Sequence, residues 1–178
     1  MKTQMNRRKA IGGILAGAAA TAPMAMAAGP AVDIWVDRWK KAKAFTLAVA
    51  EAMPADKYNF KPAGIADEVR TFGEQMVHLG EAEGFYLGRL GTNGRPPMTP
   101  KTFTKDVVVP YLTSLFDWSI GAINDLSDAD LTKTYGNGKM ASTGLDLLLN
   151  AFVHTAHTRG YSEMYIRAAG VKPPPYGA

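Results

Sequence analysis

The chain has 178 residues, no cysteine, and 20 Lys and Arg residues against 16 Asp and Glu residues. The lack of cysteine excludes a disulfide framework and any thiolate ligand or nucleophile. Four of the basic residues lie within residues 1–27, which contain no acidic residue, so the rest of the chain is formally neutral. No basic patch remains that would predict nucleic-acid binding.

Residues 1–27 have the pattern of a cleavable export signal. A start with four basic residues within positions 2–9 precedes a weakly apolar stretch at 10–22. The small-residue pattern at 25–27 then predicts a mature start near Ala28. The pair Arg7-Arg8 resembles a twin-arginine signal, although a general secretory signal or an uncleaved anchor would also account for the segment. We therefore expect an exported, periplasmic protein without stable membrane insertion after signal removal.

Residues 28–178 have the usual length of a single domain. An amphipathic pattern predicts the first helix over residues 33–52, followed by a loop at 53–64 that contains two prolines. Thr71 and Glu74 form a capping-box pattern that starts the second helix, which we expect to continue to Leu90.

The third helix is predicted over residues 105–126. A turn at 135–139 then leads to Ser142 or Thr143 as the cap of the last helix, which we expect to end at Gly170. Four amphipathic helices without a convincing alternating strand predict an all-α four-helix bundle. The helix order around the bundle stays open.

The inward faces of these helices are predicted from apolar residues at helical spacing. The first face includes Ile34 and the second includes Phe85, whereas Glu81 and Glu83 are expected on a solvated face. Aromatic residues at such spacing usually belong to a core, so we assign Trp35, Trp39 and Trp118 to it.

The chain has three histidines, His78 in the second predicted helix and His154 and His157 in the last. Imidazole is the commonest protein ligand for transition metals, and bundle cores are where such sites are usually built. An ordinary hydrogen-bonded histidine is the alternative interpretation of each.

Three segments together resemble the DinB-like (DinB/YfiT) family: residues 53–62, residues 71–79 and residues 154–174. The resemblance implies a four-helix bundle with unusual connectivity, often dimeric, so we expect a homodimer. It also implies a divalent metal held by three histidines. Some relatives are metal-dependent thiol transferases, hydrolases or isomerases, and many have no assigned reaction.

The family pattern places metal ligands at His78, His154 and position 158, and here the chain departs from it because position 158 is Thr158. Positions 157 and 158 point about 100° apart around a helix. His157 can therefore be the third ligand only if the metal shifts or the helix rewinds locally, for instance through a π-bulge. The sequence predicts a weakened site for zinc, nickel, iron or manganese.

Other residues are candidates for the same site. Glu74 and Glu81 lie about one turn from His78 and are alternative ligands, although a capping role for Glu74 is simpler. Tyr165 shares the face of His154 and is a candidate to line the same pocket, although an aromatic residue at helical spacing usually belongs to the core. Arg159 and Arg167 are candidates for holding an anionic substrate, and Arg167 equally complements the helix dipole.

Two main hypotheses follow, and no catalytic residue is assigned under either. The first is an exported metal-dependent hydrolase or thiol transferase acting on a small-molecule substrate. The second is a metal-free small-molecule binding or interaction module on the same bundle, and a purely structural protein is a third possibility. Whether the protein is an enzyme is left open.

Overall fold

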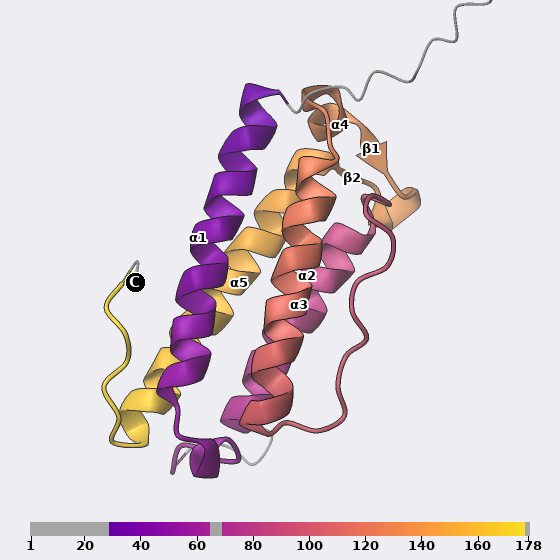
Figure 1. Cartoon of the computed structure of the whole chain (residues 1–178). Helices are drawn as coiled ribbons and strands as arrows, with labels where there is room; N and C mark the ends of the chain where they lie inside the picture. The colour runs from indigo at the N-terminus through magenta and orange to yellow at the C-terminus, as the bar shows by residue number, and fades with distance from the viewer. Residues whose placement is uncertain (1–28, 65–68, 177–178) are drawn as a thin grey trace, which may run out of the picture.

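The structure is a computed structural model that describes residues 29–64 and 69–176. The predicted export signal at 1–27 lies outside the described residues. Four long helices, α1 (Pro30–Ala52), α2 (Phe72–Gly88), α3 (Lys105–Asn124) and α5 (Gly144–Ala168), form a bundle (Figure 1). The predicted all-α four-helix bundle is confirmed.

The connections decide the helix order that the sequence left open. α1 packs against α3 and α5, and α2 packs against the same two helices. Residues 89–104 return along the length of the bundle, so α2 and α3 run in one direction and α1 and α5 in the other (Figure 1). This order brings α2 and α5, which carry His78 and His154, into contact.

Side-chain caps fix where the two histidine-bearing helices begin. Thr71 Oγ1 accepts the backbone N–H of Glu74 at 3.2 Å, and Glu74 Oε2 accepts the backbone N–H of Thr71 at 2.6 Å. Thr143 and Asp146 make the same reciprocal arrangement at the start of α5. Each box satisfies backbone donors that a helix start would otherwise leave without a partner.

Several boundaries differ from the predicted ones by a few residues. α1 begins at Pro30 because proline suits a first helical position, and Asp128 Oδ1 accepts the N–H of Val32 at 3.1 Å. At the end of α5 the cap is Ala169, and Gly170 follows with a φ of +76°, the conformation for which glycine is favoured.

The short elements of the structure were not predicted from the sequence. They are α4 (Asp128–Thr132), the 3-10 helices η1 (Ala55–Lys57) and η2 (Gly138–Met140), and the antiparallel strands β1 (Thr134–Tyr135) and β2 (Ser142–Thr143). The two strands pair Thr134 with Thr143 and Tyr135 with Ser142 across the predicted Gly-rich turn. Elements this short have no periodicity that a sequence pattern could reveal.

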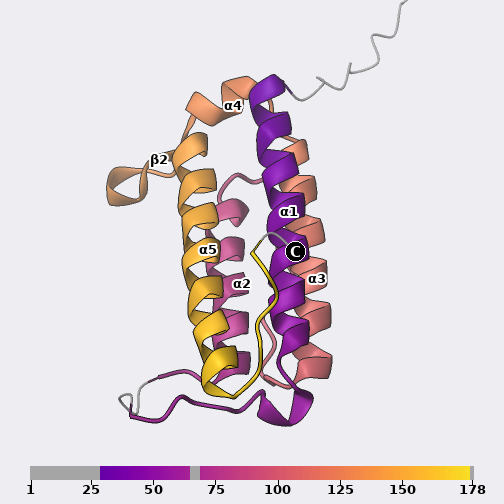
Figure 2. The same ribbon diagram turned by 90° about the vertical axis from the view of Figure 1, so that its left-hand side faces the viewer.

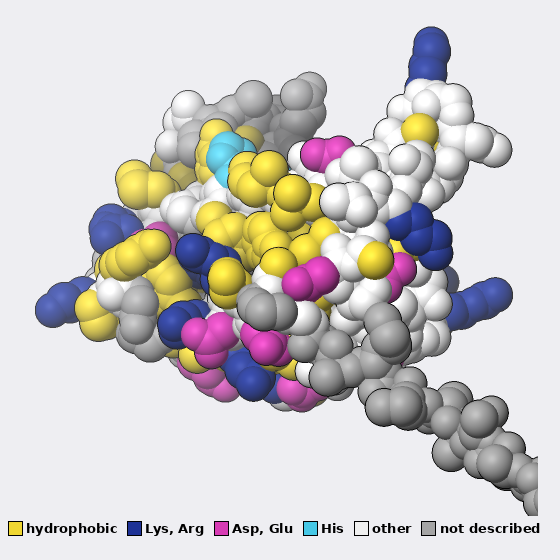
Figure 3. Space-filling view, turned by 90° about the horizontal axis from the view of Figure 1, so that it is seen from above, with side chains coloured by type: hydrophobic (Ala, Val, Ile, Leu, Met, Phe, Trp, Pro, Cys, Tyr) yellow, Lys and Arg dark blue, Asp and Glu magenta, His cyan; other side chains and the backbone are white. Residues whose placement is uncertain are grey.

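The core lies between the four long helices and includes the fully buried Trp39, Phe72 and Phe116. Trp118 is buried as predicted, whereas Trp35 is half-buried. Seen from the end at which α1 begins, apolar side chains gather near the middle and most charged side chains lie around them (Figure 3). No helix among residues 29–64 and 69–176 is long and apolar enough to span a membrane.

Two apolar residues predicted to face inward do not. Ile34 is 58% exposed and Phe85 is 52% exposed. Each lies two residues, about 200° of helix rotation, from the buried positions on either side of it. The inward face of α1 includes Val32 and Val36, and that of α2 includes Leu87.

Candidate functional site

His78 and His154 face each other across the contact between α2 and α5. Their ring centroids are 5.1 Å apart, and the ring planes meet at 75°, an edge-to-face arrangement. Both side chains are half-buried. Two of the predicted site residues, far apart in sequence, are therefore brought together.

The other two predicted positions line the same surface groove as this pair but differ from each other in exposure. His157 is exposed, and its ring packs on Tyr161 with centroids 4.8 Å apart. Thr158 is 1% exposed, and its Oγ1 lies 3.4 Å from His154 Nδ1. The residue at the family's third ligand position thus contacts His154 through a neutral hydroxyl.

These residues do not form the three-histidine set that the resemblance implies. Among the described residues, no group of three or more His, Asp or Glu side chains is arranged to hold a metal ion. A hydroxyl is a poor replacement for imidazole as a zinc or nickel ligand. The donor set in this part of the chain therefore does not fit a tightly held metal.

The carboxylates near His78 have other roles. Glu74 is engaged in the cap of α2, and its hydrogen bond from the Thr71 backbone is the main reason why its pKa lies below the usual value. Glu81 is half-exposed, and its Oε2 lies 3.8 Å from His78 Nδ1. The capping interpretation of Glu74 is confirmed.

The histidine pair lines an open groove with a volume of about 450 Å³. Arg70, Tyr161 and Tyr165 also line it, and Tyr165 belongs to the buried core as well. The Tyr165 hydroxyl donates a hydrogen bond to the Arg70 carbonyl at 3.0 Å. This bond ties the segment that precedes α2 to α5.

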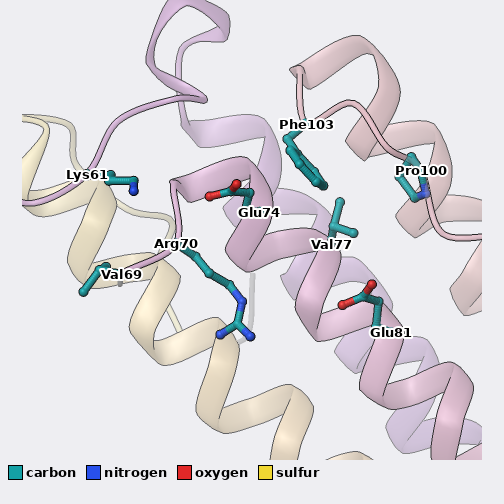
Figure 4. Close-up of a pocket in the computed structure, with 8 residues that line it drawn as sticks. All are labelled: Lys61, Val69, Arg70, Glu74, Val77, Glu81, Pro100 and Phe103. Carbon is teal, nitrogen blue, oxygen red and sulfur yellow. The ribbon is translucent and has the colours of Figure 1, made fainter. Parts of the chain in front are cut away.

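Arg70 also lines a neighbouring depression on the outer side of α2. Figure 4 shows its side chain extending alongside α2, with Glu74 and Glu81 on that helix, and Lys61 nearby. Arg70 therefore belongs to both hollows and supplies a positive charge at the boundary between them. Arg70 was not a predicted site residue, because nothing in its local pattern indicates that it lies near α5.

The surroundings of the two histidines favour their neutral forms. Burial lowers the pKa of His78, and the positive charge of Arg70 adds to this effect against the opposing influence of Glu81. Burial also lowers the pKa of His154, with further contributions from His78, His157 and Arg70. A neutral imidazole offers one N–H donor and one nitrogen acceptor.

Glu83 corrects the expectation of a solvated face on α2. Its side chain is fully buried, with Oε1 accepting the indole N–H of Trp39 at 2.9 Å and Oε2 accepting the Thr155 hydroxyl at 3.4 Å. Burial raises the pKa of Glu83 to about 7, although the Ser119, Trp39 and Thr155 side chains oppose that increase. Its spacing from Met76, Leu79 and Leu87 on the buried stripe could have revealed this position.

The two arginines proposed to hold an anion do not line the histidine groove. Arg167 is half-exposed, and its Nη1 lies 3.7 Å from Glu163 Oε2. Arg159 is buried and faces α1, beside Phe45. Among the described residues that line the groove, the arginine is Arg70, beside His78 and His154.

The comparisons with known proteins agree with this architecture. A model of the DinB superfamily matches residues 38–162. A DinB-like protein from Bacillus cereus ATCC 10987 has a TM-score of 0.70 at 17% identity, over 80% of this chain and 95% of that one. A DinB-like protein from Bacillus subtilis has a TM-score of 0.65 at 19% identity, over 80% and 97% of the two chains. At such identities the likeness shows the fold, and no curated protein matches significantly.

Proposed function

The chain belongs to the DinB superfamily, and from that premise we propose that it is an exported protein that binds a small organic anion in the groove between α2 and α5. The observation that carries this proposal is the presence of Arg70 beside His78 and His154 in one open groove. A guanidinium pairs well with a carboxylate, and each neutral imidazole adds one hydrogen-bond donor and one acceptor.

The charge of the groove favours an anion over a metal dication. Arg70 lies near enough to both histidines to lower their pKa values, and the same positive charge opposes a bound dication. The third family ligand position, at Thr158, holds a hydroxyl group. These features support the metal-free binding module over the metalloenzyme.

A weak divalent-metal site is the second candidate, and one contact favours it. Metal-binding histidines usually engage an outer partner through the ring nitrogen that does not bind the metal. His154 Nδ1 has such a partner in Thr158 Oγ1, at 3.4 Å, which leaves Nε2 for a ligand. A metal-dependent hydrolase or thiol transferase belongs to this candidate, with zinc, nickel, iron or manganese held by His78 and His154.

Elemental mass spectrometry separates the two candidates. The protein without residues 1–27, purified without a His-tag or chelator, is compared with its His154→Ala variant before and after incubation with excess zinc. We expect metal far below one ion per chain in both. Near-stoichiometric metal that is lost in the variant would instead establish the metal site.

Anion binding needs its own measurement. In a titration with succinate followed by two-dimensional NMR, we expect shifts at backbone amides around residues 70, 78 and 154. The Arg70→Gln variant should weaken binding about tenfold or more, since a hydrogen bond to a charged group is worth about 1.5–3 kcal/mol. Arg95→Gln removes an exposed charge outside the groove and serves as the control. Equal affinity of all three proteins would contradict the proposal.

Export is tested separately from binding. We propose that residues 1–27 direct export through the twin-arginine route and are then removed. Replacing Arg7 and Arg8 together with lysine should retain the protein in the cytoplasm, whereas a Lys2→Gln variant should still be exported. N-terminal sequencing of the exported protein should begin near Ala28, and an intact N-terminus would contradict cleavage.

A further inference from the structure

A second cavity of about 450 Å³ lies on the opposite side of α5 from the histidine groove, between α1, α5 and the C-terminal segment. Figure 2 shows this segment running alongside α1 and α5. Phe152 and Arg159 contribute from α5, Phe45 from α1 and Tyr176 from the C-terminal segment. Within residues 29–64 and 69–176, the residues that line one cavity differ from those that line the other.

The cavity contains a buried positive charge without a carboxylate partner. Arg159 is 8% exposed, and its guanidinium carbon lies 4.4 Å from the centroid of the Phe45 ring. The hydrogen bond of this side chain is a long one, from Nη1 to Thr46 Oγ1 at 3.4 Å. Among the described residues no carboxylate lies within salt-bridge distance: Glu163, one turn further along α5, acts on Arg159 only at longer range, and its Oε2 lies 3.7 Å from Arg167 Nη1. A buried charge without an ionic partner is costly, so an anion that reached Arg159 would bring a large gain.

The other lining residues are either apolar or basic. Ala42, Ala44 and Phe152 provide apolar surface, and Arg38 and Lys41 are exposed lining residues. Lys41 Nζ lies 3.0 Å from Asp37 Oδ2, but none of the described residues that line the cavity is acidic. The chemistry therefore fits a ligand with one anionic group and an apolar body.

We propose that this cavity binds an amphipathic organic monocarboxylate, whose carboxylate pairs with Arg159 and whose apolar body lies between Phe45 and Phe152. A volume near 450 Å³ falls within the usual range of small-molecule sites. Arg159 already stacks on Phe45, so part of its orientation is fixed before the ligand arrives. The inference does not depend on the groove between α2 and α5.

Calorimetric titration with decanoate tests the proposal, with decanol as the neutral ligand of equal chain length. We expect decanoate to bind the unmodified protein and decanol to bind at least tenfold more weakly. Arg159→Gln should weaken decanoate binding about tenfold to a hundredfold, as expected when charged hydrogen bonds are lost. Arg167→Gln removes the same charge from an exposed position on α5 and should leave the affinity unchanged.

A second variant tests the site independently, in case Arg159→Gln weakens binding because it fails to fold. Ala44 is an exposed residue that lines the cavity, so Ala44→Trp should block the site without changing any charge. Arg95→Gln removes an exposed charge from a position that lines neither cavity, and it should leave decanoate binding unchanged. Three results would overturn the inference: no binding of decanoate, equal binding of decanol, or unchanged affinity in both Arg159→Gln and Ala44→Trp.

Discussion

Trp39 on α1 donates its indole N–H to a carboxylate oxygen of Glu83 on α2, at 2.9 Å, in the middle of the bundle. Both residues are essentially buried, and Thr155 of α5 provides a second hydrogen bond to the same carboxyl group. The Ser119 hydroxyl of α3 is buried beside the same carboxyl group and helps to oppose the rise in its pKa. A single titratable side chain is thus surrounded by all four long helices.

The buried Glu83 predicts a stability that depends on pH. Its pKa is raised from 4.5 to about 7, so the folded state holds the proton more tightly than the unfolded state. The contribution to the free energy of unfolding is fully present below pH 4.5 and is lost as the pH rises through 7. Its size is about 3 kcal/mol at most.

Urea unfolding at pH 5 and pH 8 of the wild-type protein and Glu83→Gln measures this effect. Glutamine keeps the size of the side chain and an oxygen acceptor for Trp39, but it cannot ionise. We expect Glu83→Gln to lose most of the difference between the two pH values. Glu81→Gln, at an exposed position on the same helix, is the control and should retain it.

Arg70 predicts a shift in the titration of both histidines. Burial is the largest cause of their lowered pKa values, and Arg70 contributes to both. In NMR titrations of the imidazole C–H signals, Arg70→Gln should therefore raise the pKa of His78 and of His154. Arg38→Gln, on the side of the bundle that faces the other cavity, should change neither. If the pKa values of both histidines are unchanged in Arg70→Gln, the Arg70 side chain does not lie close to them.

Thr158 predicts that metal binding can be restored by one substitution. Position 158 lies one turn after His154, and the Thr158 side chain already contacts the ring of His154. We expect Thr158→His to bind zinc nearly stoichiometrically by elemental mass spectrometry and to gain thermal stability when zinc is added. The double variant with His154→Ala should lose both effects. Failure of folded Thr158→His to bind zinc would show that more than this ligand has changed.

The capping box of α2 predicts a local stability effect. Thr71→Ala removes a side-chain cap and should lower the free energy of unfolding by about 1 kcal/mol. Thr104 occupies the equivalent position of α3 but makes no side-chain cap hydrogen bond. Thr104→Ala should therefore have a smaller effect in the same urea denaturation experiment, and equal losses would contradict the capping role.

The sequence by itself determined the parts of this protein that depend on local interactions. Helix propensity and hydrophobic periodicity predicted the four long helices, and Thr71 and Thr143 fixed the starts of two of them through hydrogen bonds that span three residues. Resemblance to known proteins, rather than periodicity, identified His78 and His154 as candidates for the same site. The structure places their rings 5.1 Å apart.

Only the tertiary structure decided which helix faces meet. Helical spacing shows which residues share a face, but the surroundings of that face depend on helices far away in sequence. This is why Arg159 faces α1 and Arg70 reaches the histidines, although no local pattern required it. The spacing of Glu83 places it on the buried stripe of α2, but its hydrogen-bond partners Trp39 and Thr155 come from other helices. Burial, and with it the raised pKa of Glu83 and the buried charge of Arg159, arises only when these distant surfaces pack together.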